Sequence, residues 1–385
     1  MASRNVIAKE NRREKPDGVD VPFLILILVL LGVGLTMLYS ASYAQSEYDT
    51  GYTVSTRYLQ KQAACAALGL AAMYFFSRIP VSFWYRFAVP LYGISIALLL
   101  SVLVFGRSAN GAQRWINIGG LQFQPSEIAK FTLILLLARL TRRYGGAARE
   151  FRYGVLGFSC VLLGILIPLA LEKHLSAILL MGMVAVVMMY VAGTDPKWLL
   201  LGATGAIAFV LVYIRFMGYA GDRVTAWLHP EQDPGDTGYQ ILQSLYAIGS
   251  GGVFGRGFGK SRQKYLYLPF QYNDYIFPII CEELGLVGAV GIMLLFSAVI
   301  LRGYWIALRA RDRFSTVLCA GLVSLIALQT VLNLGVVTNL LPSTGISLPF
   351  FSYGGTALAV NLGEMGIVLG ISRQRNRSKL QEAEL

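Results

Sequence analysis

The chain has 385 residues, of which 55% are hydrophobic and 14% are charged, and its formal net charge at pH 7 is +12. A soluble protein of this size would need more charge on its surface, so the composition argues against a soluble protein. Apolar runs of about 20 residues recur along the whole length, and an α-helix needs this length to cross a bilayer. We therefore expect a helical membrane protein with many spans.

Ten apolar stretches are long enough to be membrane spans. They cover residues 21–42, 58–76, 87–106, 125–141, 154–171, 175–192, 198–216, 274–301, 314–341 and 349–372. The expected fold class is an all-α polytopic membrane protein, a single membrane domain over residues 21–372 with short tails at 1–20 and 373–385. Its largest extracytoplasmic loop, residues 217–273, joins spans 7 and 8. The first apolar run lacks a cleavage site and is expected to be retained.

The distribution of Lys and Arg predicts the orientation of the chain. With the N-terminus inside, the inner segments hold 21 of the 33 Lys and Arg residues and the outer segments hold 11. This inner excess places both termini in the cytoplasm and the long loop outside. The loop mixes aromatic residues, prolines and glycines, which favours a folded external cap over a flexible tether.

Cysteine and histidine positions do not predict a metal site. The four cysteines, Cys65, Cys160, Cys281 and Cys319, lie far apart in apolar runs, as small buried residues do. The only histidines, His174 and His229, lack zinc-ligand spacing. The sequence therefore predicts no structural metal.

A basic cluster lies in the long loop, within the stretch "FGRGFGKSRQK". It does not match a nucleotide-binding phosphate loop, because Phe254 occupies the position of the first glycine. Two interpretations remain open, a solvated surface patch and an anion site for a lipid phosphate. The cluster consists of Arg256, Lys260, Arg262 and Lys264.

Charged residues also occur inside the predicted spans. Glu127 and Lys130 follow Pro125, which suits the first position of a helix, and their spacing of three places them on one helix face. They are expected to form an intramembrane ion pair or to line a cavity for an anionic substrate. Glu282 and Glu283 point about 100° apart on a helix and so need different partners. The stretch 339–357 is rich in proline and glycine, so it must be buried in protein or line a cavity.

Four motifs carry a resemblance to a known family. They are "QRWINIGGLQFQPSEIAK", "DPGDTGYQILQSLYAIGSGGVFGRGFGKSRQKYLYLP", "DYIFPIICEELGLVG" and "LPSTGISLPFFSYGGTA". In this order they resemble the SEDS proteins, the RodA, FtsW and SpoVE group, and more closely its division and sporulation branch. "YNDYIF" departs from the family pattern, in which a threonine commonly precedes the aspartate, and "EKHLSA" departs from the elongation branch.

The resemblance implies a peptidoglycan glycosyltransferase that polymerises lipid II at the outer face of the bacterial cytoplasmic membrane. It implies a class B penicillin-binding protein and other divisome proteins as partners, contact with membrane lipids, and no nucleic acid. The family's essential acid matches Asp233, which we interpret as the general base. Substrate-binding positions carried over from the family are Arg114, Glu127, Lys130, Lys264, Asp274 and Glu283.

The implied reaction needs one base and groups that stabilise a departing diphosphate. A divalent cation, Mg²⁺ or Mn²⁺, would suit this chemistry, although no residue cluster requires it. Two alternatives come from the residues themselves. A lipid II flippase would also use intramembrane charges, and a scaffold that recruits a synthase would leave Asp233 dispensable.

Overall fold

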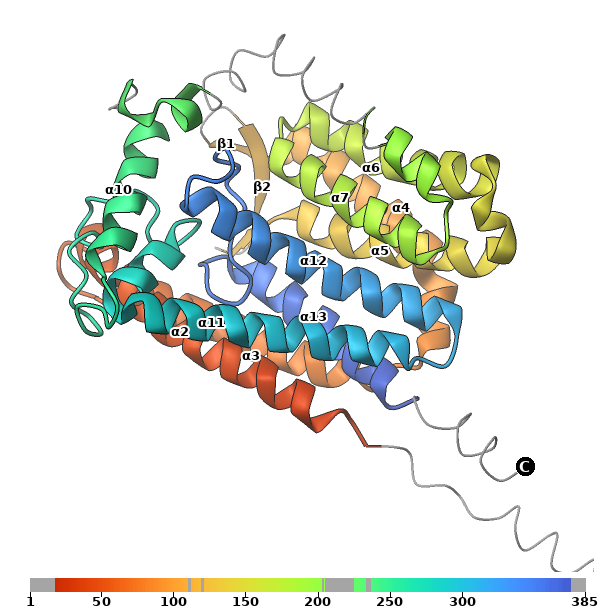
Figure 1. Ribbon diagram of the computed structural model, residues 1–385, viewed down its shortest axis with the longest axis horizontal. Coiled ribbons are helices and arrows are strands. Elements are labelled where there is room, and N and C mark those ends of the chain that lie inside the picture. Colours follow the sequence, from red (N-terminus) through yellow and green to blue (C-terminus); the bar gives the residue numbers. More distant parts are fainter. Residues whose placement is uncertain are drawn as a thin grey trace, which may run out of the picture.

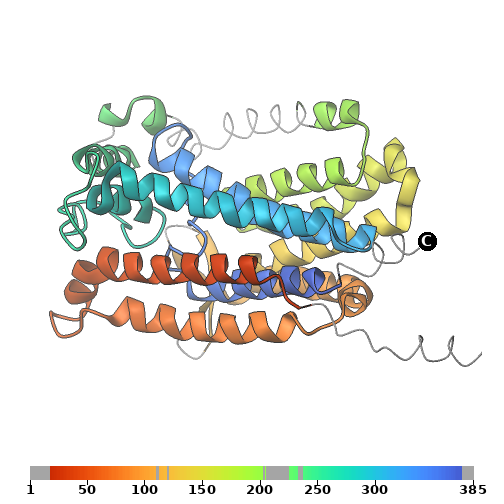
Figure 2. The ribbon, with the colours of Figure 1, turned by 60° about the horizontal axis from the view of Figure 1, so that its bottom comes forward.

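The computed structural model describes residues 18–109, 112–118, 121–202, 204, 225–232 and 237–374. The chain is mostly helical, and its long helices run side by side along the long axis of the molecule (Figures 1 and 2). The helices are α2 (Val21–Asp49), α3 (Arg57–Phe76), α4 (Val81–Phe105), α5 (Pro125–Tyr144), α6 (Gly157–Leu171), α7 (Leu175–Val191), α10 (Thr237–Ser250), α11 (Ile276–Leu308), α12 (Arg313–Val337) and α13 (Gly355–Ser372).

Six helices in the described part of the chain are long and apolar enough to cross a membrane. They are α2, α4, the stretch Phe151–Leu171 that includes α6, α11, α12 and α13, and α7 is a shorter apolar helix. The prediction of a helical membrane protein is confirmed. The count of ten spans stays a prediction, since most of the seventh stretch, 198–216, lies outside the described residues.

Some helix boundaries differ from the sequence-based prediction. α4 begins at Val81 rather than at residue 87, directly after Pro80, whose extended backbone starts the helix. α13 begins at Gly355 rather than at residue 349, because the chain before it forms turns. The Ser352 hydroxyl in these turns donates to the Asn273 carbonyl, and residues 345–347 line a cavity, which agrees with the expectation that the stretch 339–357 is buried in protein or lines a cavity.

A small antiparallel sheet corrects the all-α prediction. Its strands β1 (Arg107–Ala109), β2 (Ala112–Ile118) and β3 (Leu121–Phe123) lie in the order β1-β2-β3 between α4 and α5. Arg107 pairs with Trp115, and Ile116 pairs with Phe123. The strands are too short to show a clear alternating pattern in the sequence. The sheet matters because β2 carries Arg114.

Polar contacts define one end of the helix bundle, which we call the termini end. Asp20, just before α2, forms an ion pair with Arg302 of α11 at 3.0 Å and accepts a hydrogen bond from Phe23 at the start of the helix. The Asp20 N–H donates to Ser372, the last residue of α13. The opposite end, which we call the loop end, holds α10 and the long loop (Figures 1 and 2).

Helices α3 and α13 pack closely. A methyl group on Gly366 of α13 would lie 2.4 Å from the carbonyl oxygen of Met73 in α3, so only glycine permits this approach. Further toward the loop end, buried Gln62 donates to the Ser352 carbonyl at 3.1 Å and accepts from the Gly354 N–H at 3.2 Å. α3 thereby fixes the position at which α13 begins.

Candidate functional site

The long loop is attached to α11 at a break in that helix. Gly285 has a φ of 67°, which interrupts the helical backbone two residues after the paired glutamates. The backbone groups released there bond to the loop instead. The Leu286 N–H donates to the Gly252 carbonyl at 2.9 Å, and the Arg256 N–H donates to the Glu282 carbonyl at 3.0 Å. The loop is therefore held by backbone as well as by side chains.

Glu282 binds one turn of the loop. Its carboxylate accepts hydrogen bonds from the Ser261 hydroxyl at 2.5 Å, the Arg262 N–H at 3.0 Å and the Gln263 N–H at 3.2 Å. The Arg256 guanidinium lies 3.7 Å away and balances the charge. Only 1% of the Glu282 side chain is exposed, and these contacts compensate for its burial.

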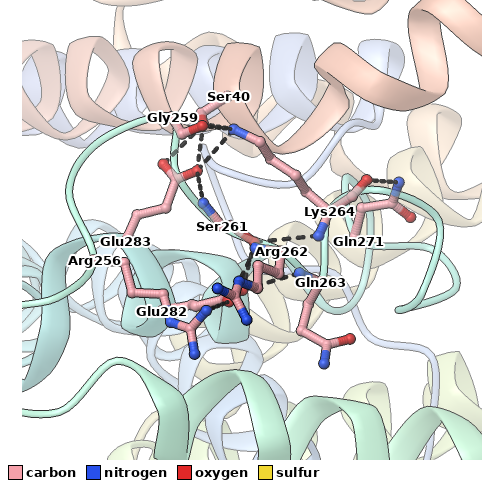
Figure 3. A network of polar contacts seen from close by, with 10 residues as sticks. All are labelled: Ser40, Arg256, Gly259, Ser261, Arg262, Gln263, Lys264, Gln271, Glu282 and Glu283. Carbon is pink, nitrogen blue, oxygen red and sulfur yellow. Dashed lines mark hydrogen bonds and ion pairs between the residues drawn. The ribbon is translucent and has the colours of Figure 1, made fainter.

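Glu283 binds a different set of partners, as the sequence predicted for adjacent acids. Its carboxylate forms an ion pair with Lys264 at 3.0 Å and accepts a hydrogen bond from Ser40 of α2 at 2.7 Å (Figure 3). The Lys264 ammonium has three donors, and they reach Glu283, Ser40 and the Gly259 carbonyl. The exposed fractions of the Lys264 and Glu283 side chains are 4% and 0%. This pair uses its hydrogen-bonding capacity within the protein.

Glu127 and Lys130 form a second buried ion pair, at the start of α5. Their carboxylate and ammonium lie 2.7 Å apart, and the exposed fractions of the Lys130 and Glu127 side chains are 5% and 10%. Both residues line a small cavity of about 60 Å³. The first turns of α7 with His174 before them, Gln329 of α12 and the segment 345–347 complete its wall. The structure therefore supports both expectations for this pair, an ion pair and a place beside a cavity.

Several buried polar atoms around this cavity have no hydrogen-bond partner in the described part of the chain. They are Ser126 Oγ, His174 Nδ1, Gln329 Oε1 and both carboxylate oxygens of Glu364. Glu364 lies in α13 and is 2% exposed. Sequence reasoning missed it, although a single acid inside an apolar span was a sufficient signal. It also missed Gln329, and it considered His174 only as a metal ligand and rejected that role.

Arg114 reaches the turn between α6 and α7. Its guanidinium donates to the Lys173 carbonyl at 2.6 Å, so the sheet is connected to the turn that carries Glu172 and His174. Burial raises the pKa of Glu172 to about 8, and the charge of Arg114 opposes this rise. Burial lowers the pKa of His174 to about 3, and the charges of Arg114 and Lys130 add to the effect. The imidazole is therefore neutral at neutral pH.

Asp274 lies beside the same segment that closes the small cavity. Asn333 of α12 donates to the Asp274 carbonyl and to the Ile346 carbonyl, both at 2.8 Å. A methyl group on Gly345 would lie 3.4 Å from the Asp274 carboxylate. Gly345 and Ile346 line the cavity that Lys130 lines, so Asp274 belongs to its surroundings.

The predicted base, Asp233, lies outside the described residues, but its flanks are anchored. On the N-terminal side, the Trp227 indole donates to the Asn339 carbonyl at 3.0 Å. On the C-terminal side, Ser244 of α10 donates to the Val337 carbonyl at 2.7 Å. Both contacts attach described residues on either side of Asp233 in the sequence, Trp227 and Ser244, to the end of α12.

The predicted residues thus fall into two groups. Glu127, Lys130, Asp274 and, through the α6–α7 turn, Arg114 surround or adjoin the small cavity, whereas Lys264 and Glu283 form the separate network that holds the loop. Among the residues that the structure describes, no group of three or more histidine, cysteine, aspartate or glutamate side chains could hold a metal ion.

Comparison with known proteins identifies the family. A family described as "Cell cycle protein", covering FtsW, RodA and SpoVE, matches residues 21–377. The chain belongs to the FtsW/RodA/SpoVE family. The resemblance seen in the four sequence motifs is confirmed.

Members of the FtsW/RodA/SpoVE family match nearly the whole chain. A probable peptidoglycan glycosyltransferase FtsW from Geobacter metallireducens is 38% identical, over 92% of this chain and 94% of the relative. The stage V sporulation protein E of Bacillus subtilis is 37% identical, over 93% of this chain and 98% of the relative. A solved structure of a peptidoglycan synthase complex that coordinates polymerization and crosslinking matches with a TM-score of 0.79 and 29% identity, covering 94% of this chain and 99% of that one.

Proposed function

We propose that the protein is a peptidoglycan glycosyltransferase that polymerises lipid II into β-1,4-linked glycan strands during cell division or sporulation. The observation that carries this proposal is the match to FtsW and SpoVE relatives at 37–38% identity over more than nine tenths of the chain. The FtsW relative is itself named as a probable peptidoglycan glycosyltransferase. A cavity lined by a buried cation in a membrane protein suits a substrate that is anionic and attached to a lipid.

We assign the general base to Asp233. In the proposed step the acceptor hydroxyl loses its proton to the Asp233 carboxylate, and its oxygen bonds to the anomeric carbon of the donor. The bond between that carbon and the diphosphate breaks, so one displacement inverts the configuration. Pro234 restricts the backbone of Asp233 to extended conformations, which favours a fixed direction for the carboxylate.

The buried charges near the cavity supply the remaining parts of the site. Lys130 stabilises the departing diphosphate, Glu127 holds Lys130 in position, and Arg114 and Asp274 orient the substrate at the rim. A buried cation is effective here because the low dielectric strengthens its attraction to developing negative charge. Lys264 and Glu283 act as positioning residues that hold the loop carrying Asp233. A divalent cation, Mg²⁺ or Mn²⁺, would assist the diphosphate in the same way as Lys130.

Replacement of Asp233 tests the proposal. Loss of a general base typically reduces a rate by about 10²–10⁴-fold, so Asp233→Asn should reduce lipid II polymerisation to near background while the protein stays folded. Glu231→Gln and Asp236→Asn are matched controls in the same segment and should retain substantial activity. Gel analysis of glycan strands made from purified lipid II measures the effect. A fully active Asp233→Asn protein would contradict the base assignment and favour a flippase.

We further propose that the chain lies in the bacterial cytoplasmic membrane with both termini in the cytoplasm, and that a class B penicillin-binding protein and other divisome proteins accompany it. The Lys and Arg distribution supports this orientation. The contacts that join Asp20, Arg302 and Ser372 agree with it, because they place the start of α2 and the end of α13 at one end. Polymerised strands need crosslinking, and the structural match to a synthase complex supports such a partner.

Cysteine labelling tests the orientation. A Cys160→Ser background removes the exposed native thiol, and the other three native thiols are buried. Lys260→Cys, in the long loop, should react with a membrane-impermeant maleimide added outside intact cells. Arg311→Cys, between α11 and α12, should react only after the membrane is opened. The reverse pattern would place the proposed active site in the cytoplasm and contradict the proposal.

A further inference from the structure

Two contacts with α11 mark the boundaries of the membrane along α2. At the termini end, Asp20 forms its ion pair with Arg302, and the Arg302 guanidinium lies 3.9 Å from the centroid of the Trp305 ring. Arginine and tryptophan are typical of the boundary between lipid and water. Toward the loop end, Ser40 donates to the Glu283 carboxylate at 2.7 Å. These two contacts enclose one stretch of each helix.

The enclosed stretch matches the hydrocarbon core of a bilayer. At 1.5 Å per residue, Ser40 lies about 30 Å along α2 from Asp20, and the hydrocarbon core is about 30 Å thick. Neither residues 21–40 nor residues 284–301 contain a charged side chain. Large apolar side chains are exposed along this length, among them Ile25, Val29, Leu294 and Leu301. The level of Ser40 and Glu283 is therefore the boundary of the hydrocarbon core on the side of the loop end.

One segment of the long loop lies at this boundary. Residues 252–262, which we call the boundary segment, bond to α11 on both sides of its break. The Val287 N–H donates to the Val253 carbonyl at 3.1 Å, and the Gly257 N–H donates to the Glu283 carbonyl at 3.0 Å. Its later part lies beside α2 (Figure 3). The segment is thus held at the depth at which the hydrocarbon begins.

The boundary segment exposes large apolar side chains. The exposed fraction is 83% for Phe254 and 49% for Phe258, and Val253 is 54% exposed. Exposure of such side chains to water is unfavourable. Phenylalanine is favourable where lipid headgroups meet the acyl chains, as in helices that lie in the membrane interface. The depth of the segment and its exposed rings therefore agree.

Unpaired cations lie in the same segment. Lys260 and Arg262 are exposed, and neither forms an ion pair with any residue that the structure describes. Residues 251–273 contain four basic residues and no acid. The acids of α11 beside the segment are already paired, with Arg256 and Lys264. Unpaired positive charge at the level of the headgroups complements the phosphates of anionic lipids.

The boundary segment is separate from both cavities. The larger cavity, of about 410 Å³, lies at the loop end and is bounded by α3, β2, the end of the long loop and the start of α13. Arg57 and Lys61 of α3 line it. None of residues 252–262 lines this cavity or the one beside Lys130. The exposed rings and cations of the segment therefore need a different explanation.

We propose that the boundary segment is an interfacial anchor, in which Phe254 and Phe258 insert among the lipid headgroups while Lys260 and Arg262 bind the phosphates of anionic bilayer lipids. Of the two interpretations open for the basic cluster, this one assigns its exposed members to lipid phosphate. A bilayer is favoured over a protein partner because the segment lies at the boundary and combines rings with cations. The anchor fixes the depth of the loop, and it does not depend on the reaction.

Fluorescence quenching tests the depth of the segment. In a Cys160→Ser background, which leaves only buried native thiols, Phe254→Cys is labelled with bimane in the full chain in phosphatidylcholine nanodiscs. Lipids with a nitroxide near the glycerol should quench bimane at this position several-fold more strongly than at Tyr48→Cys. Tyr48 is the matched control, because it is also exposed but lies about 12 Å beyond Ser40 along α2. Equal quenching at the two positions would overturn the proposed depth.

The same probe tests the preference for anionic lipid. Phosphatidylglycerol with the nitroxide should reach half-maximal quenching at a concentration about 10- to 30-fold lower than phosphatidylcholine, since two cations near a membrane surface contribute about this factor. Lys260→Ala/Arg262→Ala should remove the preference, and Lys260→Arg/Arg262→Lys should retain it. Arg78→Ala/Arg86→Ala, which removes two exposed cations at the termini end, is the matched control and should change nothing. A preference that survives Lys260→Ala/Arg262→Ala would contradict the role of these cations.

Two competitors test what covers the segment. If lipid II displaces phosphatidylglycerol from the probe at a small fraction of its concentration, the cations bind substrate and the proposal is wrong. If the transpeptidase partner abolishes the quenching, the segment is a protein interface and the proposal is wrong. Quenching that both additions leave unchanged supports the anchor. A chain that shows this quenching but does not polymerise lipid II would contradict only the proposed function.

Discussion

Two buried Lys–Glu ion pairs lie in the described part of this protein, and their surroundings are opposite. Both Lys264–Glu283 and Glu127–Lys130 are nearly inaccessible, with N–O distances of 3.0 and 2.7 Å. The first pair is surrounded by hydrogen-bond partners from α2 and the long loop (Figure 3). The second lies beside a cavity, among buried polar atoms without partners in the described part of the chain.

This difference shows how to distinguish a structural ion pair from a functional one. A polar network whose members are all satisfied makes a segment rigid, whereas a partly satisfied one costs stability unless a ligand or water completes it. The Lys264–Glu283 network fixes the loop. The buried polar atoms near Lys130 lack partners, which a polar ligand or water in the cavity would supply. Burial and charge alone would have assigned the two pairs the same role.

The largest expected effect comes from breaking the satisfied pair. Glu283→Gln leaves Lys264 as an uncompensated buried charge, and loss of one partner of a buried pair costs about 3–5 kcal/mol of stability. The double variant Lys264→Met/Glu283→Gln should recover much of this loss and much of the activity. Thermal unfolding in detergent measures the stability, and lipid II polymerisation measures the activity. A double variant that is as stable as wild type but inactive would place these residues in contact with substrate.

The Glu127–Lys130 pair should give the opposite pattern, in which a double variant recovers stability but not activity. Lys130→Met should reduce polymerisation by about 10²–10³-fold, the usual consequence of removing a group that stabilises developing charge. Adding Glu127→Gln removes the unpaired buried acid and should restore stability without restoring activity. The same two assays test this prediction. Recovery of activity in the double variant would mean that Lys130 is only half of a structural pair.

A smaller effect, on the pH dependence of stability, is expected from Glu172 in the turn between α6 and α7. The pKa of Glu172 is raised from 4.5 to about 8, so above pH 4.5 the folded protein retains a proton that the unfolded chain releases. The contribution of Glu172 to the free energy of unfolding therefore decreases as pH rises from 4.5 toward 8. His174 has a lowered pKa, so its contribution to stability increases as pH rises to 6.5 and offsets that of Glu172 there. The decrease due to Glu172 should therefore be visible between about pH 6.5 and 8.

We expect a decrease of about 1 kcal/mol in wild type over this interval, after allowing for solvent screening, and almost none in Glu172→Gln. Unfolding temperatures measured at half-unit pH steps would show the difference. Equal slopes in both proteins would mean that Glu172 is ionised in the folded state across the whole interval.

Local patterns in the sequence predicted local geometry well. The spacing of Glu127 and Lys130 predicted a shared helix face, and the adjacency of Glu282 and Glu283 predicted different partners, because both follow from helix geometry. The partner of Glu283 could not be predicted in this way. Ser40 is 243 residues away along the chain, and only the packing of α2 on α11 brings it near.

The cavity of about 410 Å³ at the loop end was missed for the same reason. Its walls come from α3, the sheet, the long loop and the start of α13, and no single stretch of sequence contains enough of it to form a pattern. Arg57 and Lys61 have the appearance of ordinary interfacial cations in the sequence. Only the tertiary structure shows that both cations line a cavity and that neither forms an ion pair among the described residues.

The attachment of the long loop to the broken helix α11 has a consequence for biosynthesis. The ribosome makes residues 251–264 before it makes Glu282, Glu283 and the Gly285 break that bind them. In the proposed orientation the loop crosses the membrane without its anchor and must wait until α11 is inserted. During this interval Lys264 has no carboxylate to pair with, so the nascent loop is exposed to proteases and chaperones. The time between synthesis of the loop and insertion of α11 sets how long this vulnerable stage lasts in the cell.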